Sequence, residues 1–166
     1  DSDSATNTVQ ENAASGATVG LTASSSDSDG STNTITYSIT AQSCSGVFAV
    51  GSSSGIVTVT SNTNLNYESA TSCTVTVKAA SSDGSHASAT FTVAVTDEAV
   101  TVTDTSASIA ESASNSASVV TVAATGDTGS LTWAIDSGDT DGDSDNNAPF
   151  AIGASTGVMT INDADD

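Results

Sequence analysis

The sequence predicts an all-β protein made of tandem Greek-key β-sandwiches. The first observation is a repeated phrase: residues 48–59 read FAVGSSSGIVTV and residues 150–161 read FAIGASTGVMTI. Each copy joins a short apolar strand to an alternating apolar and polar strand through a polar turn that ends on glycine, which is typical of a half-buried hairpin. Apolar residues nowhere recur with a helical period, and the copies lie about a hundred residues apart, so we expect small β domains in tandem.

Residues 1–100 are predicted to form the first domain, with seven short strands separated by clusters of Gly, Asn, Asp and Ser. We expect these strands at 6–11, 18–23 and 35–40, in the two halves of 48–59, and at 73–80 and 87–96. Serine and threonine alternate with valine within them, as in Thr74-Val75-Thr76-Val77, so the polar residues belong to the solvent-facing side. The sandwich core is then a thin layer of Val, Ile, Ala and Leu.

Residues 101–166 are predicted to form a second, partial sandwich, because the same order of segments restarts there. Strands are expected at 106–111, 117–124 and 131–136, followed by the hairpin 150–161. The strands at 73–80 and 87–96 have no counterpart. The second module is therefore truncated, or completed by strands of another chain, or sufficient as a smaller divergent domain; an uncovered sandwich face would favour aggregation.

The charge balance is extreme, with 20 acidic residues against one basic residue and a net charge of −19. Nucleic-acid binding is excluded because phosphate contacts need Lys and Arg, and no apolar segment is long enough for membrane insertion. Such acidity suits a protein that binds divalent cations or lives in high salt, and equally one whose charge keeps strand edges apart. The single histidine, His86, lies in a loop without partners for catalysis, so we do not expect an enzyme.

The first module resembles a cadherin repeat, or the cadherin-like domains of microbial extracellular and surface proteins. The resemblance rests on the order and spacing of several short motifs, which together cover nearly all of residues 1–104. These motifs are Val9-Gln10-Glu11-Asn12, Asp27-Ser28-Asp29, Ile35-Thr36-Tyr37-Ser38-Ile39, the hairpin 48–59, Leu65-Asn66-Tyr67-Glu68, Ala79-Ala80-Ser81-Ser82-Asp83-Gly84 and Thr92-Val93-Ala94-Val95-Thr96-Asp97. Residues 101–166 resemble the family more weakly.

The resemblance implies Ca²⁺ between consecutive sandwiches, because Ca²⁺ takes six to eight hard oxygen ligands and carboxylates from both sides would clamp the joint. It assigns Glu11, Glu68 and Asp97 to the joint with the second module, which would add Asp127. It assigns Asp27, Asp29 and Asp83, with Asp1 and Asp3, to a half-site facing a preceding module. The linker Asp97-Glu98-Ala99-Val100-Thr101 departs from the family pattern DxNDN.

A second acidic cluster, Asp139 to Asp145, places four carboxylates at alternate positions before the second hairpin. It lacks the glycine and the final glutamate of an EF-hand loop, so we expect a solvated acidic loop.

The only cysteines are Cys44 and Cys73. In this type of sandwich the end of the third strand lies beside the start of the sixth, which permits a disulfide closing a loop of about thirty residues and contributing roughly 3 kcal/mol. A disulfide implies an oxidising, extracellular setting. The alternative is a pair of buried free thiols.

These observations favour a structural extracellular protein, at a cell surface or in a secreted filament. We expect a repeat unit of a filament or long surface adhesin that self-associates head to tail, either through Ca²⁺ at the joints or through strand exchange. The alternative is an adhesive binding module that recognises carbohydrate or protein on a cell surface. Carbohydrate binders present exposed aromatic rings, and aromatic residues make up only 4% of this sequence.

Overall fold

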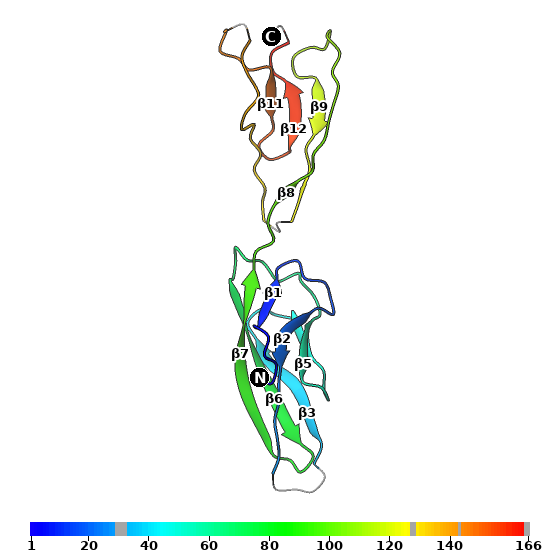
Figure 1. Cartoon of the computed structure of the whole chain (residues 1–166), viewed down its shortest axis with the longest axis vertical. Coiled ribbons are helices and arrows are strands. Elements are labelled where there is room, and N and C mark those ends of the chain that lie inside the picture. Colours follow the sequence, from blue (N-terminus) through cyan, green and yellow to red (C-terminus); the bar gives the residue numbers. More distant parts are fainter. Residues whose placement is uncertain (29–32, 127–128, 143, 165–166) are drawn as a thin grey trace. The chain divides into compact units, whose positions relative to one another are not determined.

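The computed structural model describes residues 1–28, 33–126, 129–142 and 144–164, and the described residues contain strands and no helix (Figure 1). The chain divides into two compact units, Asp1–Glu98 (unit 1) and Ala99–Asp166 (unit 2), and each is described by itself. The described residues accordingly offer no helix able to cross a membrane. The predicted all-β class is confirmed.

Unit 1 is a sandwich of two sheets. The first sheet has the order β1 (Thr8–Gln10), β7 (His86–Thr96), β6 (Ser72–Ser81) and β3 (Ile35–Gln42). The second has the order β2 (Thr18–Thr22), β5 (Ile56–Val59) and β4 (Phe48–Val50). Neighbouring strands are antiparallel except β1 and β7, which run parallel. Each of the seven strands overlaps a range predicted from the sequence.

The core of unit 1 is built from alternate residues of these strands, as the period-two pattern predicts. Val75 and Val93 are fully buried in β6 and β7, and Val57 faces them from β5. The other buried apolar members are Val9, Val19, Leu21, Ala23, Cys44, Val47, Phe48, Val59, Leu65, Cys73, Val77 and Val95. With so few aromatic residues, small β-branched side chains fill the space between the sheets.

The predicted disulfide joins Cys44 to Cys73, with a Cα–Cα distance of 5.6 Å. Its position follows from strand pairing, because β3 and β6 are antiparallel and Gln42 lies opposite Val75. Both half-cystines are buried in the core. The bridge therefore closes the end of the four-stranded sheet onto the loop that leads to β4.

Unit 2 contains β8 (Thr101–Val102), β9 (Ser118–Thr121), β10 (Ala124–Thr125), β11 (Phe150–Ile152) and β12 (Val158–Ile161). β8 pairs with β10. β11, β12 and β9 form a three-stranded sheet (Figure 1). The strands β11, β12 and β9 of this sheet correspond in order to β4, β5 and β2 of unit 1, and individual backbone hydrogen bonds around the two sheets match as well. The backbone N–H of Trp133 donates to the Ala154 carbonyl at 2.8 Å, as the backbone N–H of Tyr37 donates to the Ser52 carbonyl at 2.8 Å.

Two strands predicted in unit 2 are absent, and those predictions were wrong. Residues 106–111 and 131–136 form no strand, although their unit 1 counterparts are β1 and β3. In unit 1, β1 obtains its ladder from β7, and β3 obtains its ladder from β6. The described residues of unit 2 include no equivalent of β6 or β7. The two segments carry the strand pattern in sequence but have no strand to pair with.

The two units also differ in how many apolar side chains they bury. Among the described residues of unit 2, Ile161 is the one buried large apolar side chain, at 4% exposure, whereas the core of unit 1 spans both of its sheets. The three-stranded sheet of unit 2 has no counterpart of the four-stranded sheet packed against it among the described residues.

Candidate metal centre

Three acidic side chains meet at one end of unit 1, where β1 and β7 stop. Gln10 lies opposite Thr96 in the parallel pairing of these strands, so the next residues, Glu11 and Asp97, leave the sheet side by side. Glu68 reaches the same place from the loop between β5 and β6. One carboxylate oxygen from each of Glu11, Glu68 and Asp97 lies within 4.8 Å of the others. Among the described residues, this is the one place where three such ligand atoms gather.

Glu11 is the fixed member of the cluster, because its side chain is fully buried. Its Oε2 accepts a hydrogen bond from Tyr67 N–H at 3.0 Å, and its Oε1 accepts one from Glu98 N–H at 3.0 Å. A buried carboxylate without such donors would be strongly unfavourable, and charge-assisted bonds of this kind are about twice as strong as neutral ones. Glu11, which follows β1, is thereby hydrogen-bonded to Tyr67 in the loop before β6 and to Glu98, two residues after the end of β7.

The geometry fits a calcium ion. Oxygens bound to one Ca²⁺ at 2.3–2.6 Å are at most about 5.2 Å apart, so a separation within 4.8 Å allows all three groups to bind the same ion. Glu68 and Asp97 are exposed and can adjust, whereas Glu11 is preorganised by its hydrogen bonds. Three carboxylates offer at most six of the six to eight oxygens that Ca²⁺ takes. A further segment or water would complete the shell.

Glu98 is a participant that the sequence analysis did not single out. Its backbone N–H binds Glu11, and its carboxylate accepts a hydrogen bond from the Gln10 side-chain amide. The sequence signal was the acidic pair Asp97-Glu98 directly after a predicted strand. Only the folded chain shows that the pair contributes one candidate ligand and one backbone donor.

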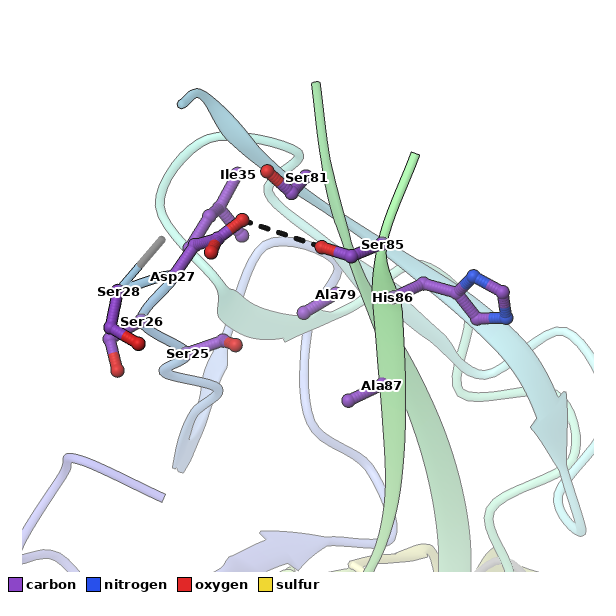
Figure 2. Close-up of a pocket in the computed structure, with 10 residues that line it drawn as sticks. All are labelled: Ser25, Ser26, Asp27, Ser28, Ile35, Ala79, Ser81, Ser85, His86 and Ala87. Carbon is purple, nitrogen blue, oxygen red and sulfur yellow. Dashed lines mark hydrogen bonds between the residues drawn. The ribbon is translucent and has the colours of Figure 1, made fainter. Parts of the chain in front are cut away.

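At the opposite end of the four-stranded sheet, Asp27 and Asp83 are linked through Ser85. Ser85 N–H donates to Asp83 Oδ1 at 2.8 Å. The Ser85 hydroxyl donates to Asp27 Oδ2 at 3.4 Å, the bond drawn in Figure 2. The backbone hydrogen bond from Ser85, followed by the bond from its side chain, lowers the pKa of Asp83, while the charge of Asp27 opposes this shift. Asn33 Nδ2 also donates to Asp27 Oδ2 at 3.1 Å.

The remaining members predicted for that half-site are placed only in part. Asp29 lies outside the described residues. Asp1 Oδ1 accepts hydrogen bonds from the backbone N–H groups of Asp3 at 3.0 Å and Thr22 at 3.2 Å, so it anchors the beginning of the chain to β2. The described residues thus show Asp27 and Asp83 joined by a serine, and they show no trio of ligands there like that of Glu11.

In unit 2, Asp127 lies outside the described residues. In the acidic run 139–145, of which residue 143 lies outside the described residues, Asp139 and Asp141 hold their own loop together. Asp141 accepts hydrogen bonds from the backbone of Ser144 at 2.6 Å and Asn146 at 2.9 Å, and Asp139 accepts one from Phe150 N–H at 3.0 Å. These carboxylates satisfy backbone donors in a loop where Ser144 and Asn146 adopt positive φ.

The cavity nearest to Asp27 has a volume of about 210 Å³ and includes the single histidine in its lining. Figure 2 shows the His86 ring pointing away from Asp27 and Ser85. A base in a catalytic triad must be oriented by an acid and must reach a nucleophile. His86 is the first residue of β7 and not part of a loop as expected, and among the described residues no acid or nucleophile of this cavity is hydrogen-bonded to its ring.

Comparison with known proteins identifies a domain family and similar folds. The model of the cadherin domain matches residues 6–96, more than half of the 166 residues. The fold matches EC22-24 of mouse cadherin-23 with a TM-score of 0.50 and 22% identity, covering 95% of this chain and 50% of that chain. It matches EC1-2 of human protocadherin-24 with a TM-score of 0.48 and 24% identity, covering 92% and 71%.

A third similar structure is EC1-3 of Drosophila N-cadherin, with a TM-score of 0.46 and 20% identity, covering 94% of this chain and 51% of that chain. This chain therefore spans about half the length of the cadherin-23 and N-cadherin structures. No protein of curated function matches the sequence. At these identities the structural likeness concerns the fold.

Proposed function

The chain belongs to the cadherin family, and we propose that it is a repeat unit of an extracellular filament or long surface adhesin. Cadherin domains are extracellular adhesive or structural domains, they are not enzymes, and they characteristically bind Ca²⁺ at the linkers between domains. The observation that carries the proposal is the cluster of Glu11, Glu68 and Asp97 at the end of unit 1 from which the chain continues.

These three residues would hold Ca²⁺, and the ion would supply positive charge that links their carboxylates. Glu11 is held in place by two backbone donors, so binding would immobilise only the two exposed side chains. Neutralising this cluster also matters for assembly, because a net charge of −19 makes copies of the chain repel each other. We propose Asp127 as a ligand from unit 2, and Asp27, Asp29 and Asp83 as a half-site that a preceding module would complete.

We further propose that residues 1–100 and 101–166 act as tandem cadherin-like modules, the second one partial. The repeated hydrogen bonds of the hairpins support this reading. Self-association into a head-to-tail polymer would then use Ca²⁺ at the joints or exchange of strands. The motif pattern supports a microbial surface protein as the source, which labelling of intact cells with an antibody to unit 1 would test.

Electron microscopy of the full chain with Ca²⁺ and with a chelator tests the proposal. We expect ordered filaments in Ca²⁺ that disassemble on chelation. The triple variant E11Q/E68Q/D97N should fail to assemble, whereas E111Q, which changes the exposed counterpart of Glu11 in unit 2, should assemble normally. Filaments that survive chelation would shift assembly to strand exchange. Single particles under every condition would contradict the filament.

An adhesive binding module is the second candidate, and one observation favours it. Tyr67, whose backbone holds Glu11, presents an aromatic side chain that is 36% exposed beside the acidic cluster. An amphipathic ring of this kind can stack on a sugar or a protein partner. Binding on a glycan array that is lost in Y67A, without filaments, would place this candidate first.

A further inference from the structure

Glu98 carries a carboxylate that lies next to the candidate metal centre but outside it. Its backbone N–H donates to Glu11 Oε1 at 3.0 Å, so its main chain contacts the cluster. Its side chain is held elsewhere, because the carboxylate accepts a hydrogen bond from the side-chain amide of Gln10. The ligand atoms within 4.8 Å of one another come from Glu11, Glu68 and Asp97, and none comes from Glu98. We call the side-chain hydrogen bond between Gln10 and Glu98 the latch.

The alternation of side chains along β1 explains why the latch and the cluster lie on different sides of the strand. Val9 and Glu11 are buried, whereas Gln10 between them is exposed. The ladder continues to Glu11, whose N–H donates to the Thr96 carbonyl at 3.1 Å. Successive side chains of a strand point to opposite faces, so Gln10 points away from the side on which Glu11 is buried. The latch therefore keeps the Glu98 carboxylate on the solvent-facing side of β1.

The candidate metal centre needs oxygens beyond those of its three carboxylates. These offer at most six, and only if each carboxylate binds through both of its oxygens, whereas Ca²⁺ takes six to eight. The segment that follows β7 has few to add, since Ala99 and Val100 carry no side-chain oxygen and the next carboxylate along the chain is that of Asp104. Glu98 is thus the nearest further carboxylate along the chain after Asp97.

Glu98 already has its backbone at the centre. It is the direct neighbour of Asp97, and its N–H is bonded to Glu11. Rotation about its side-chain bonds would exchange the Gln10 amide for a bound ion. Because Gln10 is exposed, its hydrogen bond competes with water, and a divalent cation attracts a carboxylate more strongly than a neutral amide does.

We propose that Glu98 is a fourth carboxylate ligand of the Ca²⁺ site and that the latch holds it outside the site while no ion is bound. Binding of Ca²⁺ breaks the latch, so the latch lowers the affinity and sets the concentration at which the site fills. This inference rests on the proposed function and deepens it, because it names a further ligand of the same site and the contact that regulates it. The family implies Ca²⁺ at the linkers, whereas the latch is a contact between residues of this chain.

Terbium luminescence tests the proposal on the full chain, because Tb³⁺ replaces Ca²⁺ in oxygen sites and emits when a nearby aromatic ring absorbs light. The backbone N–H of Tyr67 donates to Glu11 Oε2 at 3.0 Å, so this tyrosine lies beside the centre. The part of the emission that Y67F removes reports the site, and Y67F keeps the backbone donor. Emission lifetimes in ordinary and heavy water count the water molecules on the ion, and displacement by Ca²⁺ gives the affinity for Ca²⁺.

E98Q should leave about one more water molecule on the ion and weaken Ca²⁺ binding about tenfold, because water replaces a charged ligand. Q10V removes the latch and keeps a residue suited to a strand. It should tighten Ca²⁺ binding about threefold, because no hydrogen bond has to be broken, and should leave the number of water molecules unchanged. D104N, the matched control, changes the next carboxylate along the chain and should alter neither quantity.

An unchanged number of water molecules in E98Q would overturn Glu98 as a ligand. Equal or weaker binding in Q10V would overturn the latch, since the bond to Gln10 would then not oppose binding. Failure of the proposed function gives different results. Absence of the Tyr67-dependent emission, or its survival in E11Q/E68Q/D97N, would overturn the metal centre and this inference with it. The expected results for E98Q and Q10V without filaments would overturn the filament alone.

Discussion

The two units share one sheet and differ in the other. Both contain a hairpin, which begins at residue 48 in unit 1 and at residue 150 in unit 2, and a third strand that pairs with it, β2 or β9. The backbone hydrogen bonds around the two sheets match. Unit 1 adds β6 and β7, of 10 and 11 residues, and gains a closed core. Unit 2 has no equivalents among its described residues: residues 106–111 and 131–136 form no strand, and Phe150 and Ile161 line an open cavity of about 540 Å³. Strand formation at β1 and β3 is therefore a property of the sandwich rather than of the local sequence.

The largest expected difference between the units comes from one phenylalanine that both contain. Phe48 is 4% exposed in the closed core, whereas Phe150 is half-buried in the lining of an open cavity. F48A should lower the unfolding free energy of unit 1 by about 3–5 kcal/mol, because it removes a ring from packed surroundings. F150A should cost unit 2 about 1 kcal/mol or less, because much of that ring is already in contact with water.

Urea unfolding resolves the two effects by fluorescence. Trp133, the only tryptophan, reports unit 2, and the two tyrosines, Tyr37 and Tyr67, report unit 1. Equal losses from F48A and F150A would mean that the second unit closes its own core.

The disulfide sharpens the comparison, since it stabilises one unit only. Replacing both cysteines, C44S and C73S, should cost unit 1 about 3 kcal/mol, mainly because the reduced chain regains freedom when unfolded. The tyrosine transition should move to lower urea and the tryptophan transition should stay. A shift of both transitions would show that unit 2 depends on unit 1 for its stability.

Glu11 and Glu111 are a matched pair with opposite surroundings. Glu11 is fully buried and accepts two backbone hydrogen bonds, and Glu111 is exposed. E11Q should destabilise unit 1 by about 2 kcal/mol, because the neutral amide turns one acceptor into a donor facing a backbone N–H. E111Q should change unit 2 by less than about 0.5 kcal/mol. The tyrosine transition measures the effect of E11Q on unit 1, and the tryptophan transition measures that of E111Q on unit 2. An E11Q variant as stable as the original chain would argue against the anchoring role of Glu11.

The smallest expected effect is on how the stability of unit 1 depends on pH. Hydrogen bonds from the backbone and side chain of Ser85 lower the pKa of Asp83. A lowered pKa stabilises the fold above the ordinary pKa of aspartate, and this contribution disappears as the pH falls through the lowered value. D83N should therefore flatten slightly the dependence of unit 1 stability on pH between about pH 5 and 2. D104N in unit 2 is the control. A steeper dependence in D83N would contradict the assigned cause.

Much of unit 1 could be predicted from the sequence, because its alternating valine and threonine positions match a two-layer sandwich and its cysteines flank neighbouring strands. The family resemblance grouped Glu11 with Glu68 and Asp97, and the structure adds the physical reason, since the parallel pairing of β1 and β7 brings Glu11 and Asp97 together from far apart in the chain. The strand patterns at 106–111 and 131–136 misled the prediction: the sequence analysis noted that 73–80 and 87–96 have no counterpart in the second module, but it still expected strands where these partners are missing. That Glu11 is buried and Glu111 exposed follows from the same difference, which a shared motif cannot reveal.

The most direct test of the account is to measure hydrogen exchange of the backbone amides along the full chain. The account predicts strong protection of β3, β6 and β7 in unit 1. In the same sample it predicts rapid exchange at residues 106–111 and 131–136, because these segments belong to no strand ladder, with the exception of Trp133, whose backbone N–H donates to the Ala154 carbonyl. Protection of 131–136 equal to that of β3 would contradict it, since it would mean that unit 2 already has its second sheet.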